Sequence, residues 1–166
     1  MRNIQRNQTK KHPVLPYYTI DMSLNSQLKE NLLKPYWIID ILPRQVKAHG
    51  GGQYFKIEQF FLEPRQMDDI CRKFARMVLK LNCFEDISVC TSDDENWCDN
   101  PAPEIFQKWI LERKPLYVLL KSSDAMIAFS GEDHYLTLYS DKDVSEMIRI
   151  LASAEGLFVW KPDNNE

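Results

Sequence analysis

The chain has 166 residues, of which 44% are hydrophobic and 27% charged, and its formal net charge is −3. This length and composition exclude a disordered, collagen-like or membrane-spanning chain, and they predict one globular domain with a buried apolar core. The acidic balance disfavours a dedicated nucleic-acid binder, because such proteins are typically basic over the whole domain.

Residues 1–20 are expected to form a flexible basic arm ahead of a single domain that spans residues 21–166. The arm has no acidic residue and shows no helical or strand periodicity. Such a tail is typically solvated, and contact with phosphates or an acidic protein groove is the alternative. No apolar run of a secretory signal follows the basic residues, so we expect a cytoplasmic protein with reduced cysteines. The basic residues of the arm are Arg2, Arg6, Lys10 and Lys11.

Hydrophobic periodicity predicts a helix and then two strands at the start of the domain. A leucine at every fourth position after Ser23 indicates a short helix that Pro35 ends. A nearly continuous apolar run predicts a buried strand at Tyr36–Leu42, and alternation predicts a second strand at Tyr54–Leu62. These two strands are expected to form a hairpin across the long loop 43–52.

The middle of the chain predicts two helices around a strand. An apolar stripe indicates an amphipathic helix that starts at Pro64 and ends at Leu81. A strand is expected at Phe84–Cys90, followed by an acidic loop. The next helix begins after Asn100, where prolines are tolerated in the first turn, and it ends at Pro115.

The last third predicts strands with one more helix. The expected strands are Leu116–Leu120, Ala125–Phe129, Tyr135–Tyr139 and Leu157–Trp160, with a turn at Gly131 between the second and third. The helix is expected to start at Ser140, with Asp143 completing a capping-box-like pattern, and to end at Gly156.

This order of elements predicts an α+β fold. Adjacent strands outnumber β-α-β crossovers, so the sheet should be mostly antiparallel or mixed. We expect a two-layer domain in which three to four helices cover one face of a sheet of five to seven strands.

The glycine-rich loop at 44–52 is the first candidate binding site. Backbone N–H groups in such a loop can surround an anion, and neighbouring cationic side chains add charge-assisted hydrogen bonds. The alternative is a solvated hairpin loop. A lipase-like oxyanion loop is disfavoured, because the chain contains no G-x-S-x-G nucleophile motif. The candidate ligand-binding residues are Arg44, Lys47, His49, Gly50, Gly51 and Gly52.

The acidic loop at 91–100 is the second candidate site. A tryptophan among acidic residues is typical of an interface anchor, and the acids would steer a basic partner. The alternative is that the tryptophan folds back into the core while the acids are solvated. The candidate partner-binding residues are Asp93, Asp94, Glu95, Trp97 and Asp99.

No catalytic or metal-binding motif emerges. Ser130, Asp133 and His134 are of the types used in acyl transfer, but they share one predicted turn, where neighbouring side chains point apart. The cysteines and histidines lack the close ligand pairs of structural zinc sites, and the acidic loop lacks the glycine and glutamate of a calcium loop. We therefore expect no cofactor and no metal.

These features favour a non-enzymatic intracellular interaction module of the inhibitor, immunity or adaptor type, which binds another protein through its charged loops. The alternative is a small enzyme or ligand-binding domain that uses the 44–52 glycine loop for an anionic group. Nucleic-acid contact through the arm is a third, less favoured interpretation, and no membrane contact is expected. The oligomeric state and the identity of the partner do not follow from the sequence.

Overall fold

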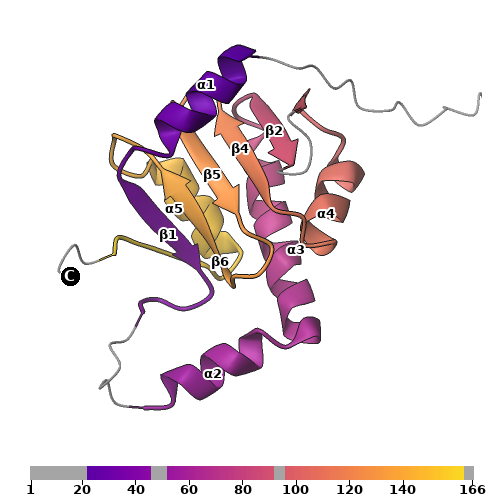
Figure 1. Ribbon diagram of the computed structural model, residues 1–166. Helices are drawn as coiled ribbons and strands as arrows, with labels where there is room; N and C mark the ends of the chain where they lie inside the picture. The colour runs from indigo at the N-terminus through magenta and orange to yellow at the C-terminus, as the bar shows by residue number, and fades with distance from the viewer. Residues whose placement is uncertain (1–21, 46–51, 92–95, 163–166) are drawn as a thin grey trace, which may run out of the picture.

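The computed structural model describes residues 22–45, 52–91 and 96–162, so the arm at 1–20 lies outside the described residues. Within these ranges the chain forms five helices and one sheet of seven strands (Figure 1). None of the helices described is both long and apolar enough to cross a bilayer. The helices are α1 (Met22–Asn31), α2 (Tyr54–Phe61), α3 (Pro64–Leu81), α4 (Pro103–Leu111) and α5 (Glu146–Ala154). The strands are β1 (Tyr36–Asp40), β2 (Ile87–Thr91), β3 (Trp97–Asp99), β4 (Leu116–Leu120), β5 (Ala125–Phe129), β6 (Tyr135–Tyr139) and β7 (Phe158–Trp160).

Each pair of neighbouring strands is antiparallel, in the order β3-β2-β4-β5-β6-β1-β7. The expected α+β fold with an antiparallel sheet is confirmed. The described part contains one helix more than the largest number expected, because residues 54–61 are helical. The first strand, β1, lies between β6 and β7, which both come from the last third of the chain. Ile38 of β1 lies opposite Thr137 on one side and Trp160 on the other.

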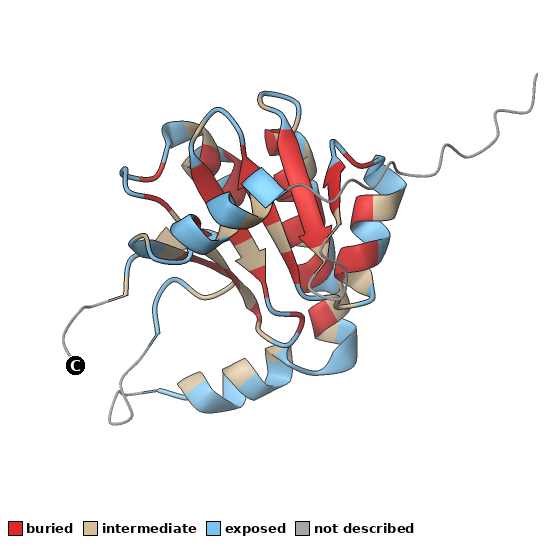
Figure 2. Cartoon of the chain, turned by 45° about the horizontal axis from the view of Figure 1, so that its top comes forward, coloured by how far each residue is buried: buried red, intermediate tan, exposed pale blue. Residues whose placement is uncertain are grey.

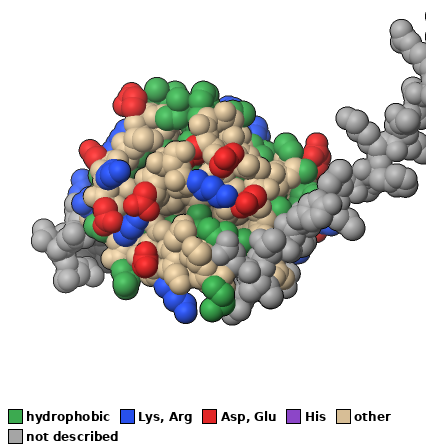
Figure 3. Space-filling view, turned by 90° about the horizontal axis from the view of Figure 1, so that it is seen from above, with side chains coloured by type: hydrophobic (Ala, Val, Ile, Leu, Met, Phe, Trp, Pro, Cys, Tyr) green, Lys and Arg blue, Asp and Glu red, His purple; other side chains and the backbone are tan. Residues whose placement is uncertain are grey.

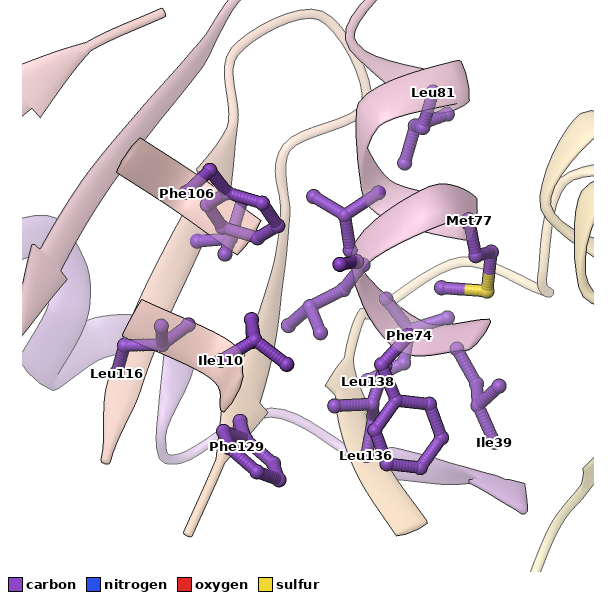
Figure 4. Close-up of a cluster of buried hydrophobic side chains, with 14 of the residues drawn as sticks. Ile39, Phe74, Met77, Leu81, Phe106, Ile110, Leu116, Phe129, Leu136 and Leu138 are labelled. Carbon is purple, nitrogen blue, oxygen red and sulfur yellow. The ribbon is translucent and has the colours of Figure 1, made fainter. Parts of the chain in front are cut away.

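The main core lies between one face of the sheet and the helices α3, α4 and α5 (Figure 1). The expected stripe of α3 is buried along its whole length. The ring of Phe74 packs edge-on against Phe129, with 6.0 Å between the ring centroids. Figure 4 shows side chains of α3 and α4 meeting those of the strands, among them Phe106, Leu116 and Leu138.

Helix α1 covers part of the opposite face of the sheet, whereas the sequence predicted helices on one face. Leu24 and Leu28 of α1 pack against a second apolar cluster that includes Trp97, Leu119 and Met126. Strand residues alternate between the two faces of a sheet, so the apolar residues of these central strands point to both layers. The four-residue leucine spacing of α1 supplies the cover for the second face.

The predicted strand at Tyr54–Leu62 is wrong, since these residues form α2. A nine-residue run that alternates also satisfies a helical pattern, because Tyr54, Glu58 and Phe61 lie at i, i+4 and i+7. These are the three half-buried residues of the helix, and the others are exposed. The expected hairpin with β1 does not form, because β6 and β7 occupy both edges of β1.

The last helix begins later than the sequence predicted. Its N-cap is Ser145, whose Oγ accepts the Ile148 N–H at 3.3 Å. Ser140 instead closes a turn, because its Oγ accepts the Lys142 N–H. The predicted end is one residue late, because Glu155 is the C-cap and Gly156 follows it at φ +71°.

Replacement of Gly131 by alanine is expected to destabilise the domain by more than about 1 kcal/mol. Gly131 has φ +87°, and a Cβ there would lie 2.2 Å from the carbonyl oxygen of Arg113. Gly52→Ala is the matched control, because Gly52 has φ +85° but no described atom lies within 4 Å of its Cβ position. Urea unfolding of both variants separates the steric clash from the backbone strain. Equal losses of unfolding free energy in Gly131→Ala and Gly52→Ala would contradict the expectation.

Candidate functional site

The glycine loop joins β1 to α2, and only its ends are described. Lys47, His49, Gly50 and Gly51 lie outside the described residues, so the expected anion site stays a prediction. Gly52, at the end of the loop, adopts a left-handed conformation before α2 begins.

The acidic loop is described only at its C-terminal end, where it forms β3. Asp93, Asp94 and Glu95 lie outside the described residues. Trp97 has no exposed surface, and its Nε1–H donates to Oδ1 of Asn25 in α1 at 2.7 Å. An exposed tryptophan anchor is therefore not what the structure contains, and Trp97 instead holds α1 against the sheet.

Asp99 differs from Trp97 because its side chain is exposed on the surface of β3. It accepts a hydrogen bond from the Ser88 hydroxyl and pairs with Lys121 at 3.1 Å. Burial alone would raise the pKa of Asp99, but the Ser88 and Lys121 contacts outweigh it and lower that pKa. The carboxylate is thus already partnered within the domain.

Charges at the α1 end of the molecule are also paired rather than gathered by sign. Figure 3 shows acidic and basic side chains interspersed on this face. Lys34, which follows α1, lies 3.1 Å from Asp124 and 3.7 Å from Asp141. Each pair joins a largely covered lysine to an exposed carboxylate, and the pairs do not create a single-sign field on the face that is visible here.

The three residues considered for acyl transfer do not converge. The Ser130 hydroxyl donates to Asp133 at 2.8 Å, and its oxygen accepts the Asp133 N–H, so both residues close the β5–β6 turn. His134 contacts neither of those side chains in the described hydrogen bonds. It points instead to two carboxylates that are distant in sequence, which agrees with the expectation that neighbours in a tight turn point apart.

Those carboxylates create the most unusual polar site in the described structure, which we name the His134 cluster (Asp40, Tyr54, Glu58 and His134). The Nδ1 of His134 lies 3.0 Å from Oδ1 of Asp40 on β1, and its Nε2 lies 3.1 Å from Oε1 of Glu58 on α2. The side chains of His134 and Asp40 are 5% and 2% exposed, against 27% for Glu58. Tyr54, one turn before Glu58 on α2, acts on the same carboxylate.

The electrostatics of the cluster favour a protonated imidazole. Burial by itself lowers the pKa of His134, but the hydrogen bonds and charges of Asp40 and Glu58 raise it to about 9. Burial and the charge of Glu58 raise the pKa of Tyr54 to about 12. At neutral pH the imidazole of His134 is therefore protonated, and the phenol of Tyr54 is neutral.

This arrangement determines what His134 can do chemically. Ionised carboxylates only accept hydrogen bonds, so both ring nitrogens must donate, and only the imidazolium has two N–H groups. General-base catalysis and metal ligation each need a ring nitrogen with a free lone pair. The geometry instead suits a structural bridge that links α2 to the β1–β6 end of the sheet.

The helix on the outer side of this bridge is the least buried element of the described structure. Figure 2 shows α2 in the colours of exposed and half-buried residues, in contrast to the buried strands. None of its residues, all of which are described, is fully buried. Four large apolar side chains on and just after α2 are between 40% and 53% exposed, namely Phe55, Ile57, Phe60 and Leu62.

The sequence patterns did not reveal the His134 cluster, because its members come together only in the folded chain. Glu58 and Asp40 lie 76 and 94 positions before His134. One signal was present in Asp40, which interrupts the apolar run of residues 36–42. A carboxylate in a buried strand requires a partner, since an unpaired buried charge is costly.

A small hollow of about 160 Å³ lies near the start of α5. Typical small-molecule sites enclose about 300–1,000 Å³, so this hollow is suited to a few water molecules. Its lining includes Ser123, Leu138, Ser140, Lys142 and Ser145.

Comparisons with protein-family models, with curated proteins and with solved structures found no match to this chain. No relative's activity therefore bears on the His134 cluster or on α2. Any function assigned to them rests on the contacts, burial and exposure of their own residues.

Proposed function

We propose that the protein is a non-enzymatic intracellular interaction module of the inhibitor or adaptor type, and that α2 is its partner-binding element. The exposure of large apolar side chains along α2 carries this proposal. Monomeric proteins rarely leave apolar side chains gathered on one element, and such patches mark interaction sites. Helices α3, α4 and α5 bury their apolar stripes in the core, whereas α2 leaves Phe55, Ile57 and Phe60 about half exposed.

The apolar residues occupy two flanks of α2. At about 100° per residue, Phe55 and Leu62 lie on one side of the half-buried stripe, and Ile57 and Phe60 lie on the other. Lys56 and Gln59 lie between the flanks, opposite the domain. This pattern suits a partner protein with an apolar groove that receives the helix, as in helix-in-groove recognition.

The proposal moves the binding surface from the charged loops to α2. Trp97 is enclosed in the second apolar cluster, and Asp99 is partnered within the sheet. An intracellular setting is supported by the four cysteines, which are all described and form no disulfide. Burial raises the pKa of the Cys71 thiol to about 11, so this cysteine behaves as a packed apolar residue.

The test compares partner capture by the intact chain and by single variants. Phe60→Gln and Phe55→Gln are expected to lose a partner from a lysate of the native host, because each removes an aromatic anchor. Phe84→Gln is the matched control, since Phe84 is 65% exposed and lies between α3 and β2. With the purified partner, calorimetry is expected to show about 30-fold weaker binding for Phe60→Gln, the scale of an interface hot spot.

Two results would contradict the proposal. In the first, the purified partner binds the two α2 variants as tightly as it binds Phe84→Gln and the unaltered chain. In the second, sedimentation shows that the purified chain associates with itself and that Phe60→Gln abolishes this association. The occupant of α2 would then be a second copy of the chain.

A further inference from the structure

The attachment of α2 to the domain depends on few contacts. The Glu58 carboxylate, through His134, provides its charged link to the sheet. Phe61 packs against the edge of the main core, and Tyr54 is half-buried. The other large side chains of the helix lie on its flanks and are about half exposed, so they hold it in place less firmly.

Both ends of α2 adjoin backbone that suits a hinge. Gly52 precedes the helix with φ +85°, and no described atom crowds it. At the other end Glu63 is extended, with ψ 142°, before α3 starts at Pro64. A change of backbone angles at these few residues would rotate α2 without disturbing α3, as hinge motions typically do.

We propose that α2 is a hinged binding arm that the imidazolium of His134 clamps to the sheet, and that loss of the imidazolium proton releases it. The role of α2 as a binding arm rests on the proposed function, whereas the clamp itself concerns the free protein. His134 is thus a positioning residue, which acts through Glu58 on the orientation of the exposed apolar flanks.

The contacts of the ring explain why the proton matters. A neutral imidazole has one N–H, so it can donate to only one of the two carboxylates, and its lone pair then faces the other. Asp40 is enclosed and also accepts the Leu42 N–H at 3.0 Å, so it retains its position in the sheet. Glu58 is partly exposed and can turn to water, which frees α2.

The other titratable groups around the imidazole ring are acidic, so each is either negative or neutral. Tyr54 faces the cluster from α2, and Tyr135 and Asp133 lie next to it on β6 and the preceding turn. Among the described residues, the charged groups that act on His134 are the carboxylates of Asp40 and Glu58. The folded pKa of about 9 lies above the ordinary 6.5. The clamp is therefore complete below about pH 6.5 and is lost as the pH rises through about 9.

Nuclear magnetic resonance of the full ¹⁵N-labelled chain tests the clamp without any partner. The imidazole signals give the titration of His134, and ¹H–¹⁵N heteronuclear Overhauser effects report the order of each helix between about pH 6 and pH 10.5. We expect the order of α2 to fall with the same midpoint as the His134 titration, while α3 and α5 remain rigid.

Three variants sharpen the test. Glu58→Ala is expected to leave α2 loose across the whole pH range while the domain stays folded. Glu58→Gln keeps an acceptor but removes the charge, so its release midpoint should fall by about one pH unit or more. Glu63→Ala is the control, because it removes an exposed carboxylate at the far end of the helix and should behave as the unaltered chain.

Three outcomes would overturn the clamp. One is that α2 remains as rigid as α3 above the titration of His134. Another is that α2 is as ordered in Glu58→Ala as in Glu63→Ala across the pH range. The third is that α2 loosens only when every helix does so. Each is distinct from failure of the proposed function, which would appear as partner binding that is insensitive to Phe60→Gln.

Discussion

The Trp97→Ala variant is expected to lose about 3–5 kcal/mol of unfolding free energy as an isolated protein, the usual cost of deleting a buried aromatic side chain. Trp97 is completely enclosed, and it contacts residues of β2, β4 and β5 beneath α1. Its removal leaves a cavity and also deprives Asn25 of its hydrogen-bond donor. Urea unfolding followed by circular dichroism measures the loss.

The same residue separates the two interpretations of the acidic loop. Trp97→Phe keeps an aromatic ring but removes the Nε1–H. It should lose less unfolding free energy than the alanine variant, and its loss shows how much the hydrogen bond to Asn25 contributes. If Trp97 were an interface anchor, the alanine variant would weaken partner binding per folded molecule and leave unfolding almost unchanged. That pattern would return the binding surface to the loop at 91–100.

Replacement of Asp40 by alanine is expected to destabilise the domain by about 3–5 kcal/mol at neutral pH, the cost of removing one partner from a buried ion pair. The variant leaves His134 without its enclosed counter-ion and the Leu42 N–H without its acceptor. Because Asp40 supports the protonated form of His134, the imidazole pKa in the variant should also fall from about 9 toward its ordinary value. Unfolding by urea and an imidazole titration measure the two effects.

Glu58→Ala provides the comparison for Asp40→Ala. Glu58 belongs to α2 and is more exposed than Asp40, so its loss should cost the domain much less unfolding free energy. Equal costs for the two variants would mean that α2 unfolds together with the sheet. In that case α2, which carries Glu58, would not move independently of the sheet, which contains Asp40.

The fold could be predicted wherever a long segment had the hydrophobic periodicity of a helix or of a strand, but not of both. The apolar stripe from Met67 to Leu81 spans more than four helical turns. Helix α3 begins at Pro64 and ends at Leu81, as predicted. The strands 125–129 and 135–139 coincide with the structure because two short segments rich in apolar residues flank a glycine turn. Residues 54–62 satisfied both periods within a short segment, and there the choice depended on strand partners that only the tertiary structure supplies.

The candidate site was less predictable, because local patterns do not encode long-range contacts. Trp97 is surrounded by acids in the sequence, yet alternation along β3 turns it to the side that α1 covers. His134 sits in a turn, and its two carboxylate partners come from β1 and α2. Alternation suggested that Phe55 and Ile57 lie on the buried face of a strand, and only the helical structure shows that they are exposed.

The position of β1 between β6 and β7 has a consequence for how the chain folds during synthesis. The adjacent strands β4, β5 and β6 can pair as soon as each leaves the ribosome, since their contacts are local. Residues 36–40 must wait until residues 135–160 have been made before either of their edges is covered. Until then an apolar strand is unpaired, which is the kind of exposed edge that promotes misassembly. Chains halted before β6 should therefore be the forms that depend most on chaperones.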